Sequence, residues 1–164
     1  SNYRMARLAL LDHVRIPADT IPRMRGEDEP HRAARRYTRE LRKAFGQDTW
    51  PPRFDLILLG IGANGHTASL FPGTGALRER RRVVYPQYVE VQQQWRLTLT
   101  LPTINAARAV WVLVKGRDKA ATVARVLHGP SQPEVLPIQS VAPEHGDYIW
   151  WLDEAAAGDM NREC

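Results

Sequence analysis

The sequence predicts an α/β domain built on a mainly parallel sheet, and three features lead to that prediction. The run Phe54–Leu59 is apolar almost throughout rather than alternating, which is typical of a strand buried on both faces of a parallel sheet. Further strand-like segments alternate with helix-like segments along the chain. A glycine-rich loop directly follows the apolar run, where open parallel sheets bind their ligands.

Two helices are expected in the N-terminal part of the chain. The first, over residues 2–13, has an apolar residue at every third position. The second, over Pro30–Phe45, begins with a proline, which suits the first turn of a helix. The apolar stripe of this second helix is expected to consist of Ala34, Tyr37, Leu41 and Ala44.

The rest of the chain supplies further strands and one more long helix. Strands are expected at Arg96–Leu101, Val110–Val114 and Tyr148–Leu152, and a helix over Asp118–Leu127. The inward-facing residues of this helix are expected to be Ala120, Val123 and Leu127. No internal repeat or second domain is evident, so residues 1–164 are interpreted as a single domain. A helix comes first with no strand ahead of it, so the sheet is expected to be incomplete at its N-terminal side.

The composition limits the classes of protein to which the chain can belong. Hydrophobic residues make up 43% and charged residues 25% of the 164 residues, which suits one soluble globular domain with a packed core. The longest apolar runs, 54–60 and 110–114, are too short to cross a bilayer, so no membrane segment is expected. The single cysteine, Cys164, excludes an internal disulfide and a cysteine-based metal site, and it fits a cytoplasmic protein.

The charge of the chain is basic. A net charge of +5 and a sequence pI of about 9.8 suit a nucleic acid, an anionic surface or a phosphorylated small molecule as partner. Arginines concentrate at residues 32–42, with helical periodicity, and at 78–82, without interleaved aromatic residues. We interpret both stretches as solvated surface and expect no nucleic-acid partner. The five histidines are scattered and lack metal-ligand spacing, so no metal site is expected either.

The segment that carries chemistry is the loop at residues 60–73, with the sequence G-I-G-A-N-G-H-T-A-S-L-F-P-G. Its first three glycines allow positive φ angles and a close approach of a ligand to the backbone. Helix-like residues resume at His66, so the imidazole is expected near a helix N-terminus. The positive end of the helix dipole would keep that ring neutral, available as a base, and would attract anions.

Three interpretations of this loop compete. The first is a tight strand-to-helix turn with a solvent-facing histidine. The second is dinucleotide binding, because Gly60–Gly65 spells G-x-G-x-x-G, but that fingerprint needs a long helix and an acid about twenty residues further on. Pro72 and Gly73 would stop such a helix early, and 80–85 contains no acid. The third is an acid–base site that acts on a phosphosugar.

The loop resembles the signature of 6-phosphogluconolactonases, usually written G-x-G-x-D-G-H-T-A-S-L-F-P. The resemblance continues, in order, over essentially the whole chain. Segments that share it include Trp95–Pro102, Ile104–Arg108, Val114–Ala120 and Trp150–Asp153. It implies a Rossmann-like three-layer α/β/α fold with a mainly parallel sheet, truncated at its N-terminal side. The family's leading third, with its first strands and a Gly-Gly-Ser phosphate loop, has no counterpart here.

The resemblance also implies an activity and a set of site residues. Enzymes of this family hydrolyse 6-phospho-D-glucono-1,5-lactone to 6-phosphogluconate in the oxidative pentose phosphate pathway, without a cofactor. His66 would be the general base that deprotonates the attacking water. Arg96 and Lys119 would hold the phosphate. The remaining substrate-binding residues would be Gly62, Asn64, Gly65 and Thr67, with backbone N–H groups around the two glycines stabilising the oxyanion.

Two departures from the family pattern qualify these expectations. Asn64 stands where the family loop commonly has aspartate, which also counts against the related glucosamine-6-phosphate deaminases, because they use an acid there. The absent leading strands would leave an unpaired sheet edge, so the chain is expected to be weakly active or inactive alone and to self-associate through that edge. The alternative function is that of a truncated, non-catalytic sugar-phosphate-binding remnant of the same family.

Overall fold

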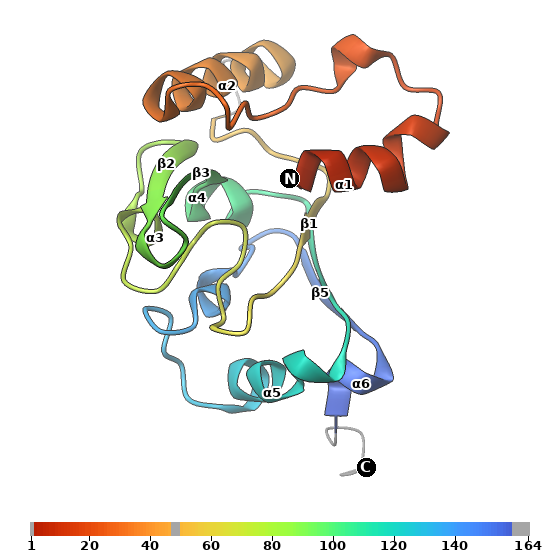
Figure 1. Ribbon diagram of the computed structural model, residues 1–164, viewed down its shortest axis with the longest axis vertical. Coiled ribbons are helices and arrows are strands. Elements are labelled where there is room, and N and C mark those ends of the chain that lie inside the picture. The colour runs from red at the N-terminus through yellow and green to blue at the C-terminus, as the bar shows by residue number, and fades with distance from the viewer. Residues whose placement is uncertain (1, 47–49, 159–164) are drawn as a thin grey trace.

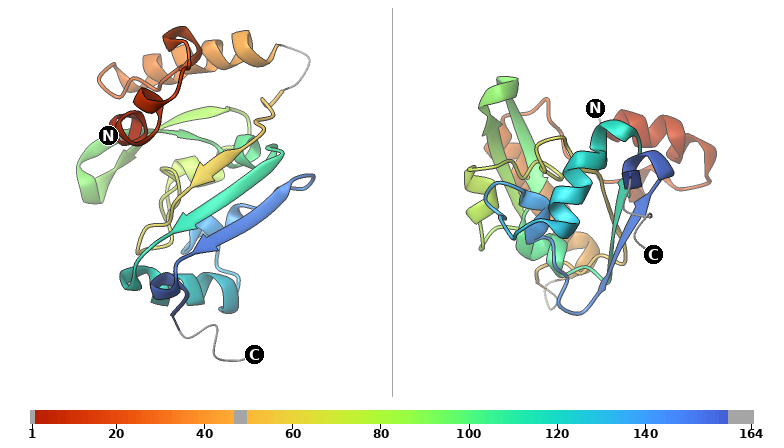
Figure 2. Two further views of the ribbon diagram at one scale, coloured as in Figure 1. Left: turned by 90° about the vertical axis from the view of Figure 1, so that its right-hand side faces the viewer. Right: turned by 90° about the horizontal axis from the view of Figure 1, so that it is seen from below.

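A computed structural model describes residues 2–46 and 50–158 of the chain (Figure 1). Three parallel strands form the central sheet in the order β1 (Ile57–Leu59), β4 (Ala109–Val114) and β5 (Asp147–Leu152). Figure 2 shows the three strands running side by side in one direction. The prediction of an α/β domain with a mainly parallel sheet is confirmed.

A separate antiparallel pair, β2 (Val84–Val89) and β3 (Gln94–Leu99), stands beside this sheet (Figure 1). The turn η3 (Glu90–Gln92) joins the two strands. The strand predicted at Arg96–Leu101 corresponds to β3, and both predicted ends lie two residues too late in the sequence. Leu101 instead begins the helix α4 (Leu101–Asn105), which has Pro102 in its first turn, and proline suits that position.

The strand β1 is buried on one face, and the prediction of a strand buried on both faces is wrong. Ile57 and Leu59 are buried, whereas Leu58 between them is 55% exposed. Leu113 of β4 and Trp151 of β5 are exposed as well, because within residues 2–46 and 50–158 little packs over their face. The opposite face carries the main core, to which the described helices and the loop after β1 contribute Leu70, Ile104, Val123 and Ile138.

The predicted helix Pro30–Phe45 is confirmed with both of its ends, as α2. The carboxylate of Glu29 accepts hydrogen bonds from the backbone N–H groups of His31 and Arg32, which caps the helix. Ala34 and Leu41 pack against Val83 and Val84, in a second core beneath the β2–β3 pair. Ala44, expected on the same stripe, is exposed at the last turn.

The first predicted helix is shorter than expected. It divides into α1 (Asn2–Ala9) and η1 (Leu11–His13), and no residue of α1 is buried. Met5 and Leu8 of its apolar stripe are 65% and 58% exposed, since nothing in the described part of the chain covers that face. The stripe was identified correctly, but its packing partner is not among these residues.

The helix predicted at Asp118–Leu127 is present as η4 (Arg117–Lys119) and α5 (Ala120–His128). Val123 faces the core as expected, but Val126 takes the place predicted for Leu127, which is 42% exposed. The elements that remain are short. They are η2 (Ala18–Thr20), α3 (Gly75–Arg78), η5 (Pro137–Ser140) and α6 (Glu154–Ala157).

The described residues contain no helix of the length and apolarity that a membrane span requires. Over the same two ranges, His, Cys, Asp and Glu side chains form no group of three or more that could hold a metal ion. Cys164, on which the sequence argument about disulfides and thiolate metal sites rested, lies outside the described residues.

Candidate active site

The loop after β1 folds back on itself and does not begin a helix at His66, so that part of the sequence prediction is wrong. The N–H of Gly62 donates to the carbonyl of His66 at 2.8 Å, and the N–H of Gly65 donates to the carbonyl of Gly62 at 2.9 Å. Two residues beyond His66, Ala68 adopts a left-handed φ of 50°, which no helix accommodates. The next helix, α3, starts only at Gly75.

The imidazole of His66 is held between the backbone of Gly62 and the ring of Phe71. The two rings stack with centroids 4.1 Å apart and planes inclined by 17°. A Cβ atom on Gly62 would lie 2.1 Å from Cε1 and Nδ1 of the imidazole. A glycine is therefore required at position 62 by close packing against the histidine.

Asn64 orients the imidazole. Its Oδ1 lies 2.6 Å from Nδ1 of His66, and because an amide oxygen only accepts, Nδ1 carries the proton. The lone pair of the neutral ring is then on Nε2, the nitrogen that this contact leaves unused. Asparagine thus fixes the same tautomer as a carboxylate would, without adding a negative charge beside the ring.

The surroundings of His66 favour its neutral form. Burial lowers the pKa of the imidazole from its ordinary value of 6.5, and the positive charges of Arg96 and Lys119 lower it further. The sequence attributed a neutral ring to a helix dipole, whereas the structure attributes it to desolvation and two cations. A neutral imidazole near pH 7 is the form that accepts a proton.

The two cations come from elements that are distant in the sequence. Arg96 lies on β3 and donates from Nε and Nη2 to Oε1 of Gln92, at 3.0 and 2.7 Å. Lys119 ends η4, where its Nζ lies 3.1 Å from a carboxylate oxygen of Asp118. Both positive charges lower the pKa of His66, so the fold places the β3 arginine and the η4 lysine within electrostatic reach of this ring.

Gly65 and Thr67 secure the loop against its neighbours. Gly65 has φ +75°, and a Cβ atom there would lie 2.6 Å from Cδ2 of Leu136. Thr67 is 1% exposed, and its hydroxyl donates to the carbonyl of Gly60 at 2.8 Å. The side chain of Thr67 is thus committed to holding the loop, and its contact with a substrate stays a prediction.

Sequence reasoning missed two residues that shape this site. Phe71 supplies the stacking surface for His66, although it stands inside the signature string. Thr122 of α5 is 5% exposed and donates from Oγ1 to the carbonyl of Ala63 at 2.8 Å, which fixes the loop to the helix. Phe71 could have been noticed in the sequence, because it is an aromatic residue within the signature string. The contact of Thr122 with the loop could not, because it depends on the tertiary fold.

A hollow of about 570 Å³ opens beside the loop. Asn64, Phe71 and the turn at 72–75 line one side, and residues 87–91, from β2 and η3, line the other. Of the site residues predicted from the sequence, Asn64 lines this hollow, whereas His66, Arg96 and Lys119 are not among its lining residues. The volume is within the range of small-ligand sites.

Known proteins resemble this chain in sequence and in fold. The profile described as "Glucosamine-6-phosphate isomerases/6-phosphogluconolactonase" matches residues 1–150. The chain belongs to this family. The 6-phosphogluconolactonases of Rattus norvegicus and of Synechocystis sp. are 43% and 41% identical to it, each over 162 residues. The solved structure of the Trypanosoma brucei 6-phosphogluconolactonase superposes with a TM-score of 0.79 at 30% identity.

The chain spans less than two thirds of each of these relatives. The alignments cover 96%, 98% and 96% of this chain, but 60%, 66% and 66% of the rat, Synechocystis and trypanosome proteins. The similarity to these relatives therefore extends over nearly the whole of this chain, and between a third and two fifths of each relative lies outside the alignment.

Proposed function

We propose that the chain hydrolyses 6-phospho-D-glucono-1,5-lactone to 6-phosphogluconate, as a cytoplasmic step of the oxidative pentose phosphate pathway. The observation that carries this proposal is the state of His66. Its ring is oriented by Asn64 with Nε2 free, and burial, Arg96 and Lys119 keep it neutral. The names of the relatives, 6-phosphogluconolactonases of rat and Synechocystis, support the same reaction.

In the proposed reaction Nε2 of His66 accepts a proton from water as the water oxygen attacks the lactone carbonyl carbon. The ring carbon–oxygen bond then breaks, and the leaving ring oxygen takes a proton back from the imidazolium. The product is the open-chain acid, so no cofactor enters the balance. Arg96 and Lys119 would bind the phosphate, and the same two positive charges disfavour premature protonation of the base.

The oxyanion that forms during the attack needs hydrogen-bond donors. The N–H groups of Gly62 and Gly65, expected in this role, already donate within the loop. Between them, the N–H groups of Ala63 and Asn64 donate to no group among the described residues. We propose that these two N–H groups stabilise the oxyanion. They lie between Gly62 and Gly65, the two glycines around which the sequence analysis expected the donors.

The proposal is tested by adding the lactone to the purified 164-residue chain and measuring release of 6-phosphogluconate above the spontaneous rate. Turnover that depends on His66 supports it. Binding of 6-phosphogluconate without any turnover would instead favour the non-catalytic remnant.

The phosphate-binding role of Arg96 gives a separate prediction. Arg96→Ala is expected to weaken 6-phosphogluconate binding roughly 10- to 100-fold, since hydrogen bonds to charged groups contribute about 1.5–3 kcal/mol each. Isothermal titration calorimetry measures the change. Arg108→Ala is the control, because Arg108 is an exposed arginine held by a side-chain contact, to Asp55, and it precedes β4 at the opposite end of the sheet. Equal affinities of the two variants would contradict the role.

The proposal extends to self-association. In the described structure β1 pairs only with β4, which leaves its other edge open, and Leu58, Leu113 and Trp151 expose an apolar face. We propose that a second copy of the chain covers this region. Sedimentation over a range of concentrations tests it, and a monomer at every concentration would contradict it.

A further inference from the structure

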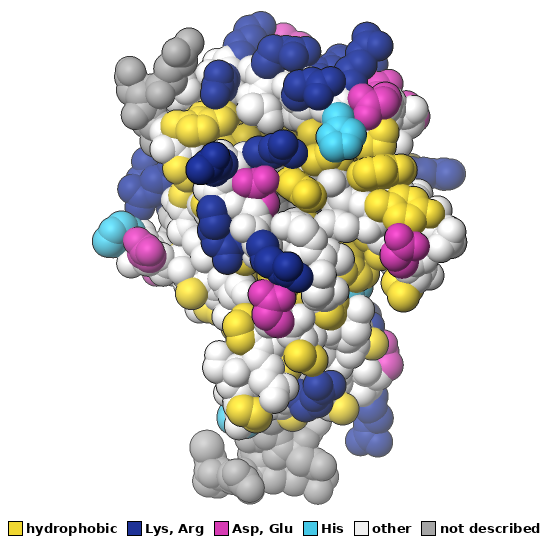
Figure 3. Space-filling model, turned by 90° about the vertical axis from the view of Figure 1, so that its left-hand side faces the viewer, with side chains coloured by type: hydrophobic (Ala, Val, Ile, Leu, Met, Phe, Trp, Pro, Cys, Tyr) yellow, Lys and Arg dark blue, Asp and Glu magenta, His cyan; other side chains and the backbone are white. Residues whose placement is uncertain are grey.

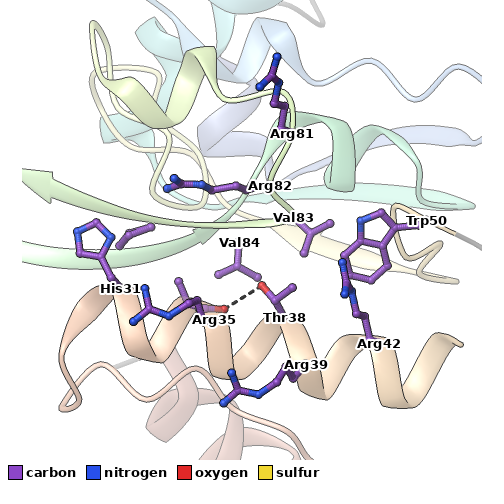
Figure 4. Close-up of a pocket in the computed structure, with 12 residues that line it drawn as sticks. His31, Arg35, Thr38, Arg39, Arg42, Trp50, Arg81, Arg82, Val83 and Val84 are labelled. Carbon is purple, nitrogen blue, oxygen red and sulfur yellow. Dashed lines mark hydrogen bonds between the residues drawn. The ribbon is translucent and has the colours of Figure 1, made fainter. Parts of the chain in front are cut away.

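The two arginine-rich stretches of the sequence meet across one cavity, away from the loop of His66. Arg35, Arg39 and Arg42 of α2 line one side of it, and Arg81 and Arg82, just before β2, line the other. In Figure 4 the side chains of Arg35 and Arg82 extend over the same end of the cavity, near His31, whereas Arg81 points away from α2 and Arg39 points away from the strands. The cavity has a volume of about 430 Å³. About forty residues separate the two stretches in the chain, so no local pattern indicated that their charges converge.

Among the described residues that line this cavity, none is acidic. Within residues 2–46 and 50–158, Arg35, Arg39 and Arg81 form no salt bridge. Glu79, the acid nearest to Arg81 in the sequence, accepts hydrogen bonds from the backbone N–H groups of Arg81 and Arg82 at 2.7 and 3.2 Å. Its carboxylate thus fixes the backbone of the arginine segment, and its Oε2 lies 3.8 Å from Nε of Arg82 in a long, exposed ion pair.

The cavity is also shaped and held by apolar groups. Val83 and Val84 are buried beneath it, and Trp50 stands at one end, where Arg42 lies 4.8 Å from the centre of its ring system. Figure 3 shows lysine and arginine side chains gathered over the upper part of this face, with apolar side chains between them. Like charges that converge on one hollow repel one another, and a bound polyanion would relieve that repulsion.

We propose that this cavity is a second binding site, for a small organic polyphosphate with two or more linked phosphate groups. Guanidinium groups bind phosphate with paired, charge-assisted hydrogen bonds, and Arg35 and Arg82, which reach the same end of the cavity from two different elements, suit two linked phosphates better than one. The Trp50 end of the cavity offers an apolar and aromatic surface to the organic part of such a ligand. This site is independent of the lactone hydrolysis proposed for His66.

The test uses the full chain and two probes, inorganic pyrophosphate and ADP, with affinities measured by calorimetry. Both probes are expected to bind, ADP more tightly if its ring contacts Trp50. The variant Arg35→Gln/Arg82→Gln removes one guanidinium from each side of the cavity and is expected to weaken binding about tenfold or more. Both side chains are exposed, so the variant is expected to fold, which its thermal melt checks.

Two controls separate this site from others. Arg15→Gln/Arg125→Gln changes the net charge equally at exposed positions that do not line the cavity, and it is expected to leave both affinities unchanged. Arg96→Gln affects the site of His66 and is also expected to leave them unchanged. The proposal is overturned if neither probe binds, if Arg35→Gln/Arg82→Gln binds like the parent, or if Arg96→Gln abolishes binding. Binding of a polynucleotide but of neither small probe would also overturn it.

Discussion

Replacing His66 by alanine is expected to lower the rate of lactone hydrolysis by about 10²- to 10⁴-fold, the contribution of a positioned general base. The imidazole stacks on Phe71, and Nε2 carries the free lone pair, so no neighbouring group offers the same proton acceptor in the same place. Binding of 6-phosphogluconate is expected to persist, because Arg96 and Lys119 remain. The rate is measured with the spontaneous hydrolysis subtracted, and the affinity by calorimetry.

His128→Ala serves as the matched control for this experiment. His128 is exposed and ends α5, and it has no assigned part in the site. It is expected to hydrolyse the lactone at the rate of the parent chain. If His66→Ala opened the lactone as fast as His128→Ala does, the role of general base would be lost.

Gly62→Ala is expected to reduce hydrolysis nearly as much as the loss of His66 itself. An alanine Cβ at this position would lie 2.1 Å from two atoms of the imidazole, a distance that no relaxation of a few tenths of an ångström accommodates. The ring would have to leave its stack on Phe71 and its hydrogen bond to Asn64. A displacement on the order of 1 Å costs about 10²-fold in rate when it misplaces a catalytic group.

The same loop offers the control for Gly62→Ala. Gly60 stands two residues earlier, and a Cβ atom there would meet only the carbonyl oxygen of Leu113, at 3.9 Å. Gly60→Ala is therefore expected to keep most of the activity. Circular dichroism checks that both variants fold. Equal rates for the two alanine variants would show that packing against Gly62 does not position the histidine.

Much of this fold could be predicted because its signals are local. In α2, Pro30 indicates the first turn of the helix, and Ala34 and Leu41 belong to its apolar stripe. Both ends of this helix were therefore predicted from the sequence. The strands β4 and β5 were each found to within one residue of their start, because β-branched and aromatic residues follow one another there. The functional loop was found because its glycines and its histidine form a recognisable string.

The errors have tertiary causes. The loop at residues 66–71 reads as a helix start, but Ala68 takes a left-handed conformation and Thr67 donates back to Gly60, so no helix forms. Of the antiparallel pair only β3 was predicted. The strand β2 was missed because it contains Pro86, and proline is unusual inside a strand. The convergence of Arg96 and Lys119 on His66 depends on the fold, and only the family resemblance indicated it.

The central claim is that His66 presents a neutral imidazole with its proton on Nδ1, and one measurement tests it directly. A pH titration of the ¹⁵N-labelled chain by NMR gives both the pKa of this ring and the tautomer of its neutral form. The account predicts a pKa below 6.5, from burial, Arg96 and Lys119, with the lone pair on Nε2. As the pH falls through that value, the base becomes protonated and hydrolysis is lost. A pKa at or above 6.5, or a neutral ring with its proton on Nε2, would contradict the account.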